Sequence, residues 1–252
     1  MPLVKHAGIQ QPRRNVIGKI ALEEHALLDR EDHIDRWRTL VPMISEQFQQ
    51  RLIAQLTDTS RRLEVMDQDE IDLAVLSNAA VVQGSLEPRA ALRMAREAND
   101  HFAEVVRARP DRFAAFATTP LQQPEEGADE LQRAVEQLGL VGTMLFRQTG
   151  GRYLDDRSFD PFWERAQDLD VPVYLHAADA AALPAGAFSD EPLRCALDAL
   201  GEDNVMYSID YPFESMTEAA EWLDASKLDA HVRAKIEHEN AQALLKLNHP
   251  AA

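Results

Sequence analysis

Short apolar runs alternate with long segments of helical periodicity along most of this chain. The helical segments carry apolar residues three or four positions apart, as in the segment 87–110. Six runs have the length and composition of β-strands, at 19–24, 72–77, 112–119, 139–146, 171–177 and 204–210. This alternation predicts an α/β fold with a parallel sheet whose strands are connected by crossover helices.

The length of 252 residues, 45% of them hydrophobic, is enough for one substantial core. Residues 1–16 are polar and contain two prolines, so we expect a loose N-terminal extension followed by a single domain over 17–252. The connection between the first two strands is longer than a crossover helix needs. Its first part, residues 25–47, is therefore expected to form a functional cap or an assembly surface.

The charge of the chain restricts its partners. With 43 acidic and 26 basic residues the formal charge is −17, which disfavours nucleic acid and anionic membranes as partners. The single cysteine, Cys195, cannot form an internal disulfide, and no apolar run is long enough to span a bilayer or to serve as a secretory core. These features are typical of a cytoplasmic protein.

Polar residues of the metal-ligand type end three of the predicted strands. Because side chains alternate along a strand, Ala21, Glu23 and His25 are expected to share one face, with Ile20, Leu22 and Glu24 on the other. The same alternation places Tyr174 with His176, and Ser208 with Asp210, on the inner faces of their strands. Leu175, Tyr207 and Ile209 are expected to face the covering helices. Ligands of parallel α/β folds bind at these carboxyl ends. Two imidazoles and two carboxylates suit zinc, manganese or iron(II).

Each of these residues also has a simpler interpretation. Glu23 and Glu24 fit a solvated strand end, because acidic side chains are usually exposed. His176 fits a core histidine with one hydrogen bond, and Asp210 before "YPFE" fits the start of a turn. The coincidence of four such residues at three strand ends, with consistent facing, favours the metal site.

The chain after Val16 resembles the amidohydrolase-related metal-dependent decarboxylases, the group of γ-resorcylate and 2,3-dihydroxybenzoate decarboxylases. The resemblance is carried by "GKIALEEH", "RRLEVMDQDEIDLAVLS", "ANDHFAEVVRARPDRFAAFATTPLQQPEEGADELQRAVEQLGLVG", "FWERAQDLDVPVYLH", "YSIDYPFES" and "AKIEHENAQALLKL". It implies a TIM-type (β/α) barrel with one divalent ion, zinc or manganese, at its mouth. By position it implies Glu23, His25, His176 and Asp210 as metal ligands. Phe213 falls where the family has an aromatic residue lining the substrate pocket.

The sequence departs from that family after His176. The family has two further strand-helix units there, including a "GHxGE" strand end whose histidine lies close to the metal, whereas only "AADAAALPA" precedes "GAFSD" here. We therefore expect an incomplete barrel, with about six of the eight strands. Its open edges would pair with another subunit or lie under the long first connection. A homodimer or a higher homo-oligomer is expected.

The resemblance implies non-oxidative decarboxylation of a small hydroxylated aromatic acid. The ion would hold the carboxylate and the ortho hydroxyl of the substrate, and Asp210 would carry the proton to the ring carbon that bears the carboxylate. Because this histidine is missing, we expect the decarboxylase activity to be weak. Two alternatives stay open: a metal-dependent hydrolase of esters, lactones or amides, and a non-catalytic metal-binding relative.

Overall fold

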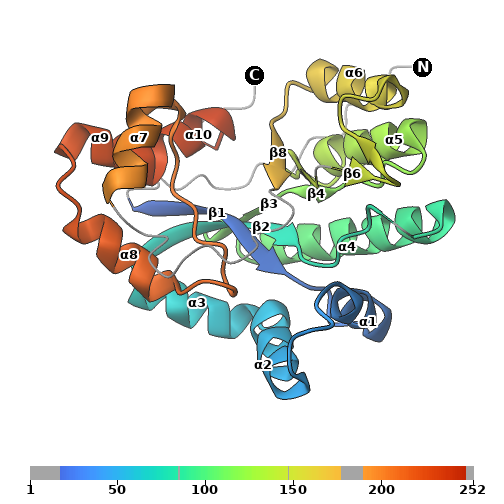
Figure 1. Ribbon diagram of the computed structural model, residues 1–252, viewed down its shortest axis with the longest axis horizontal. Helices are drawn as coiled ribbons and strands as arrows, with labels where there is room; N and C mark the ends of the chain where they lie inside the picture. The colour runs from blue at the N-terminus through green and yellow to red at the C-terminus, as the bar shows by residue number, and fades with distance from the viewer. Residues whose placement is uncertain (1–17, 85, 147, 177–189, 248–252) are drawn as a thin grey trace, which may run out of the picture.

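The computed structural model describes residues 18–84, 86–146, 148–176 and 190–247 (Figure 1). The predicted N-terminal extension and the segment "AADAAALPA" lie outside the described residues. The strands are β1 (Lys19–Ala26), β2 (Ile71–Asn78), β3 (Phe113–Ala115), β4 (Ala117–Thr118), β5 (Thr143–Phe146), β6 (Gln148–Thr149), β7 (Arg152–Tyr153) and β8 (Val173–His176). The helices are α1 (Glu31–Leu40), α2 (Glu46–Thr57), α3 (Thr59–Gln68), α4 (Pro88–Ala108), α5 (Pro124–Glu136), α6 (Asp160–Asp168), α7 (Asp190–Leu200), α8 (Met216–Ala225), α9 (Ala230–Ala234) and α10 (Asn240–Leu244). Short helical turns lie at Arg157–Phe159 and Glu202–Asn204, and a π-helical turn lies at Lys235–Glu239.

The sheet is parallel, as the alternation of runs predicts. Its two ladders have the strand orders β1-β2-β3 and β4-β5-β8, and every pair in them is parallel. The predicted strand 112–119 is split between these ladders at Phe116, whose backbone N–H donates to the carbonyl of Leu76 at 2.8 Å. The N–H of Ala117 donates to the carbonyl of Gly142, also at 2.8 Å, so the two ladders form one continuous arc.

The prediction of a strand over 204–210 is wrong. This segment makes one parallel bridge, between Ser208 and Leu22, and the N–H of Leu22 donates to the carbonyl of Tyr207 at 3.2 Å. Elsewhere its backbone is held by the C-terminal helical residues, because the N–H of Tyr207 donates to the carbonyl of Ile236 at 3.0 Å and Asn240 Nδ2 donates to the carbonyl of Val205 at 2.8 Å. Its side chains nevertheless face as predicted, since Tyr207 and Ile209 lie in the core under the helices.

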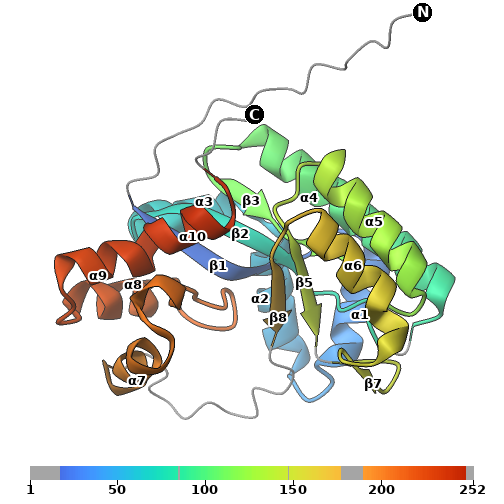
Figure 2. The ribbon, with the colours of Figure 1, turned by 90° about the horizontal axis from the view of Figure 1, so that it is seen from above.

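Two apolar layers lie on the two sides of the arc. The outer layer packs the sheet against its helices and includes Ala74, Phe102, Leu131 and Phe162. The inner layer contains Ile20, Leu22, Leu73, Val75, Ala114, Phe116 and Met144, together with Ala241 and Leu245 from the C-terminal helices. Figure 2 shows α4, α5 and α6 on one side of β1 and β2, and α7 to α10 on the other. The arrangement is that of a barrel, but no closed barrel forms among the described residues.

The long first connection folds into α1, α2 and α3. Leu27, Trp37, Leu52 and Leu56 pack with Ala79 and Ala80, so α1 and α2 cover the carboxyl ends of β1 and β2. The segment 25–47 is therefore a cap on this end of the sheet. None of the helices in the described ranges is both long enough and apolar enough to cross a membrane.

Candidate metal centre

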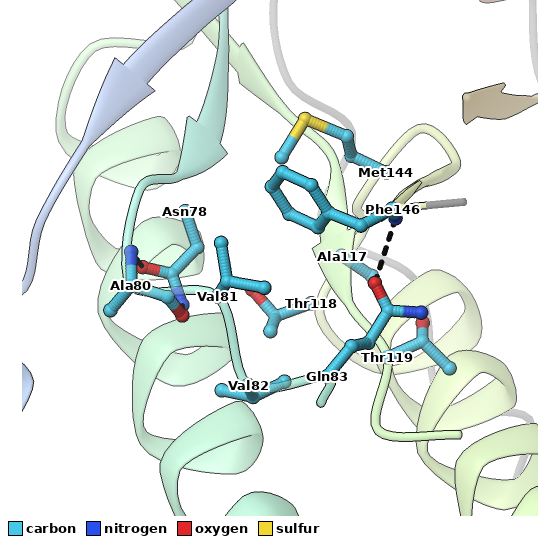
Figure 3. A pocket seen from close by; sticks show the side chains of 10 residues that line it. All are labelled: Asn78, Ala80, Val81, Val82, Gln83, Ala117, Thr118, Thr119, Met144 and Phe146. Atoms are coloured by element: carbon cyan, nitrogen blue, oxygen red, sulfur yellow. Dashed lines mark hydrogen bonds between the residues drawn. The ribbon is translucent and has the colours of Figure 1, made fainter. Parts of the chain in front are cut away.

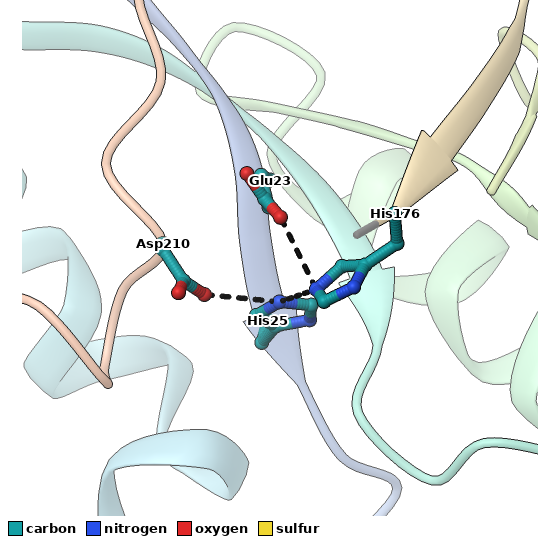
Figure 4. A group of neighbouring side chains, drawn as sticks. All are labelled: Glu23, His25, His176 and Asp210. Carbon is teal, nitrogen blue, oxygen red and sulfur yellow. Dashed lines mark hydrogen bonds and ion pairs between the residues drawn. The ribbon is translucent and has the colours of Figure 1, made fainter. Parts of the chain in front are cut away.

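Four of the side chains predicted from the sequence converge at the carboxyl end of the sheet (Figure 4). Glu23 and His25 come from β1, His176 ends β8, and Asp210 follows the bridge at Ser208. One ligand atom from each residue lies within 4.8 Å of the others. Residues far apart in the chain thus present two imidazoles and two carboxylates to one point.

A β-bulge aims Glu23 into this cluster. The register of β1 against β2 shifts between Ala21 and Glu24, and Glu23 has a φ of 63°. Leu22 lies in the inner apolar layer and Ala21 in the outer one. The prediction that Ala21 shares a face with Glu23 and His25, opposite Ile20 and Leu22, is therefore wrong, because the bulge turns Glu23 inward on the side of Leu22. Glu23 and His25 do point together, as predicted.

The separations within the cluster fit a divalent ion. His25 Nε2 lies 3.1 Å from Asp210 Oδ1, and His176 Nε2 lies 3.1 Å from Glu23 Oε1. The two Nε2 atoms are 3.3 Å apart. Ligands about 2.1 Å from a shared ion lie about 3.0 Å apart at right angles and about 3.4 Å apart in a tetrahedron. The mixed nitrogen and oxygen set suits zinc or manganese.

Neighbouring hydroxyls orient two of these side chains. The hydroxyl of Ser77, at the end of β2, lies 3.1 Å from His25 Nδ1, which leaves Nε2 for the cluster. Tyr174 donates to Glu23 Oε2 at 2.5 Å, and Ser208 lies 3.2 Å from the same oxygen. Burial and the nearby carboxylate of Glu23 raise the pKa of the Tyr174 hydroxyl, so this group stays a donor. Alternation correctly predicted that Tyr174 and Ser208 face inward, but sequence analysis gave no role to these hydroxyls or to that of Ser77.

Glu24 turns away from the cluster, as predicted, but the alternative of a solvated strand end is wrong. Its side chain is fully buried beside Arg62 of α3, with 3.6 Å between Glu24 Oε2 and Arg62 Nη1. The Arg62 guanidinium also donates to the carbonyl of His25 and lies over the ring of Tyr211, 4.7 Å from its centroid. Burial raises the pKa of Glu24 to about 8, although Arg62 opposes this shift.

Aromatic rings flank the two histidines. The ring of Phe213, the predicted substrate-facing residue, is 40% exposed and lies 5.5 Å from the ring of His25 in an edge arrangement. The ring of Phe146 lies 4.7 Å from that of His176. Phe146 also lines a small pocket at the carboxyl ends of β2, β4 and β5 (Figure 3), where its N–H donates to Gln83 Oε1 at 2.8 Å. Apolar ring surface thus borders the metal centre.

A second acidic and histidine cluster has a different character. His33, Asp32 and Glu97 lie close enough to share an ion. However, Arg93 pairs with both acids at 2.9 Å, and Arg30 pairs with Asp32 at 2.9 Å and with Glu97 at 3.0 Å. The arginines already balance both carboxylates, so this network joins α1 to α4 rather than binding a cation.

Known proteins resemble this chain in sequence and in structure. The sequence profile of the amidohydrolase family matches the chain in two overlapping stretches, residues 55–190 and 182–247. The γ-resorcylate decarboxylases of Rhodococcus jostii and of a Rhizobium species are each 30% identical, over 92% of this chain and 99% of theirs. The Rhodococcus alignment runs over 331 positions, although this chain has 252 residues. A dihydroxybenzoic acid decarboxylase from Polaromonas, solved with manganese and the inhibitor 2-nitroresorcinol, superposes with a TM-score of 0.83 at 27% identity, over 92% of this chain and 98% of that one.

Proposed function

The chain belongs to the amidohydrolase family, and we propose that it is a metal-dependent, non-oxidative decarboxylase of small hydroxylated aromatic acids. The observation that carries the proposal is the convergence of Glu23, His25, His176 and Asp210, whose ligand atoms all lie within 4.8 Å of one another. The relatives add the reaction class, since they are decarboxylases and the Polaromonas structure holds manganese with a resorcinol inhibitor.

In this proposal the four residues of the cluster hold one divalent ion, zinc or manganese. When bound, the ion supplies Lewis acidity and a fixed point for the carboxylate and ortho hydroxyl of the acid. Asp210 is the proton carrier, because its side chain is 36% exposed and can reach a substrate, whereas that of His25 is 4% exposed. Phe213 offers its half-exposed ring to the aromatic ring of the substrate.

We further propose that the domain, residues 17–252, lacks two strand-helix units between β8 and the segment 204–210. The alignment with the Rhodococcus relative runs over 331 positions and therefore contains gaps in this chain of 252 residues, which supports the proposal. The exposure of β8 supports it as well. Leu175, predicted to face covering helices, is instead 60% exposed. That prediction is wrong for Leu175, although Val173 on the same face of β8 packs against the outer apolar layer. Without the histidine of the missing units, proton delivery and therefore turnover should be weak.

Two alternatives use the same cluster. A hydrolase would use Asp210 as the general base toward water and would need an ester, lactone or amide substrate. A non-catalytic relative would keep the ion without a proton carrier. A cytoplasmic setting and a homo-oligomeric state also stay predictions of the sequence.

The test compares carbon dioxide release from ortho-hydroxybenzoates with ester and lactone hydrolysis, after loading with manganese or zinc. We expect one ion per chain, slow decarboxylation, and loss of the ion in His176→Ala. Asp210→Asn should keep affinity for the ion better than His176→Ala but lose a factor of about 100 or more in rate. His231→Ala is the control, since that side chain is 69% exposed. Faster hydrolysis than decarboxylation, or a wild type without metal, would overturn the proposal.

A further inference from the structure

We infer that Tyr174 and Ser208 are positioning residues that make Glu23 a ligand through one carboxylate oxygen. This inference rests on the proposed function. It concerns two hydroxyls that lie outside the four-residue cluster and approach the carboxylate of Glu23. Both hydroxyls approach Oε2 of Glu23, at 2.5 Å from Tyr174 and 3.2 Å from Ser208. The other oxygen, Oε1, lies 3.1 Å from His176 Nε2 inside the cluster.

The two oxygens of Glu23 therefore have different environments. A free glutamate carboxylate rotates readily and can offer one or both oxygens to a cation. Here the hydrogen bonds to Oε2 oppose that rotation and leave Oε1 as the oxygen that faces the histidines. Hydrogen bonds to an ionised acceptor are stronger than bonds between neutral groups, which suits this task.

The two hydroxyls are not equivalent. The hydroxyl of Tyr174 has Glu23 as its acceptor at 2.5 Å. The hydroxyl of Ser208 lies 2.9 Å from the carbonyl of Leu22 and 3.2 Å from Glu23, and its single hydrogen can serve only one of them at a time. Tyr174 should therefore contribute more to the orientation of Glu23 than Ser208 does.

The positions of these residues give them a second effect. Tyr174 lies on β8 and Ser208 lies in the segment 204–210, and within the described residues β8 pairs only with β5. Glu23 lies between the two segments, and its carboxylate accepts a hydrogen bond from a hydroxyl of each. The carboxylate thus joins both flanks of the open arc at the level of the cluster.

The test titrates the metal-free protein with manganese in a calorimeter, which gives its manganese affinity. Melting curves are recorded separately in chelator. We expect Tyr174→Phe to weaken manganese binding by about tenfold or more, and Ser208→Ala to weaken it by less. Ser208→Thr keeps a hydroxyl and should restore the affinity. Tyr207→Phe is the matched control, because the buried hydroxyl of Tyr207 has no hydrogen-bond partner within the described part of the chain.

The outcomes separate the inference from the proposed function. A wild type that binds no manganese overturns both. A wild type that binds manganese, with unchanged affinity in Tyr174→Phe and Ser208→Ala, overturns the inference alone. Equal loss in Tyr207→Phe and Tyr174→Phe also overturns it, since the effect is then one of packing. If Tyr174→Phe does not fold, the pair Ser208→Ala and Ser208→Thr decides. Ser208→Ala removes the hydroxyl and Ser208→Thr keeps it, so the inference requires weaker manganese binding in the first variant than in the second.

Discussion

Glu23 and Asp210 share a backbone conformation that residues other than glycine rarely adopt. Their φ angles are 63° and 71°, in the left-handed region. Such a conformation costs on the order of 1 kcal/mol or more at each position and persists only where the surroundings enforce it. Both residues bring a carboxylate to the same cluster, so this cost falls at the candidate metal centre.

Glu24 is the residue whose ionisation should most affect stability. Its carboxyl group is fully buried, neither of its oxygens has a hydrogen-bond partner among the described residues, and burial raises its pKa to about 8 from 4.5. The unfolded chain releases this proton near pH 4.5, whereas the folded chain keeps it until about pH 8. The contribution of Glu24 to the free energy of unfolding is therefore present below pH 4.5 and is lost as the pH rises toward 8.

Glu24→Gln removes this titration while keeping the shape of the side chain. We expect the variant to gain stability relative to wild type as the pH rises from 5 to 8. Urea unfolding at both pH values, in chelator so that no ion contributes, measures the difference. A constant difference between the two proteins would mean that Arg62 holds Glu24 ionised across this range.

Sequence analysis could predict which residues meet at the centre, but not every direction in which they point. Alternation along β8 correctly placed His176 inward, because that strand is regular. It failed at Ala21, because a bulge depends on how two strands fit and leaves no clear mark in one of them. The pairing of Glu24 with Arg62 joins β1 to α3 through tertiary packing, which periodicity does not report.

At the scale of elements, β8 is placed by its close approach to β5. The N–H of Thr143 donates to the carbonyl of Pro172 at 3.1 Å, and a Cβ on the preceding Gly142 would lie 2.5 Å from that carbonyl oxygen. A side chain at position 142 would therefore push β8 away from β5. His176 ends β8, so the candidate metal centre depends on this approach.

Gly142→Ala should lower both the stability of the protein and its manganese affinity. The clash is expected to cost about 1 to 3 kcal/mol of unfolding free energy. Gly127→Ala is the matched control, since its Cβ would also lie 2.5 Å from a backbone oxygen, that of Pro120, away from the centre. Urea unfolding and manganese titration are measured on both. Equal manganese affinity in the two variants would mean that the approach of β8 to β5 does not place His176.

Most of the predicted strands are present in the structure. The runs that became β1, β2 and β5 are short, apolar and buried, which is the signature of inner strands in a parallel sheet. The segment 204–210 has the same signature but makes only one bridge. The N–H of Tyr207 donates instead to the carbonyl of Ile236, and such a tertiary contact is not encoded in the segment's own residues.

At the scale of the whole molecule, the sheet is an open arc with one exposed end. β8 is its last strand in the described residues, and Leu175 on that strand is 60% exposed. An unpaired strand edge beside an exposed apolar side chain is a site where another chain can pair. A second exposed apolar residue, Met43, lies in the link between α1 and α2 and is 92% exposed.

The last prediction is that the protein is a symmetric homodimer that uses the β8 edge. Pairing two copies there would cover Leu175 together with the edge of β8 that faces away from β5, whereas Met43 lies on a helix link that has no strand edge. Light scattering at micromolar concentration should therefore give twice the chain mass of 28.3 kDa for wild type and for Met43→Asp. Leu175→Asp should shift the mass toward that of one chain, because a carboxylate would be buried without a partner. Loss of the dimer in Met43→Asp alone would assign the interface to the cap formed by α1 and α2, and a monomeric wild type would mean that the chain covers its own edge.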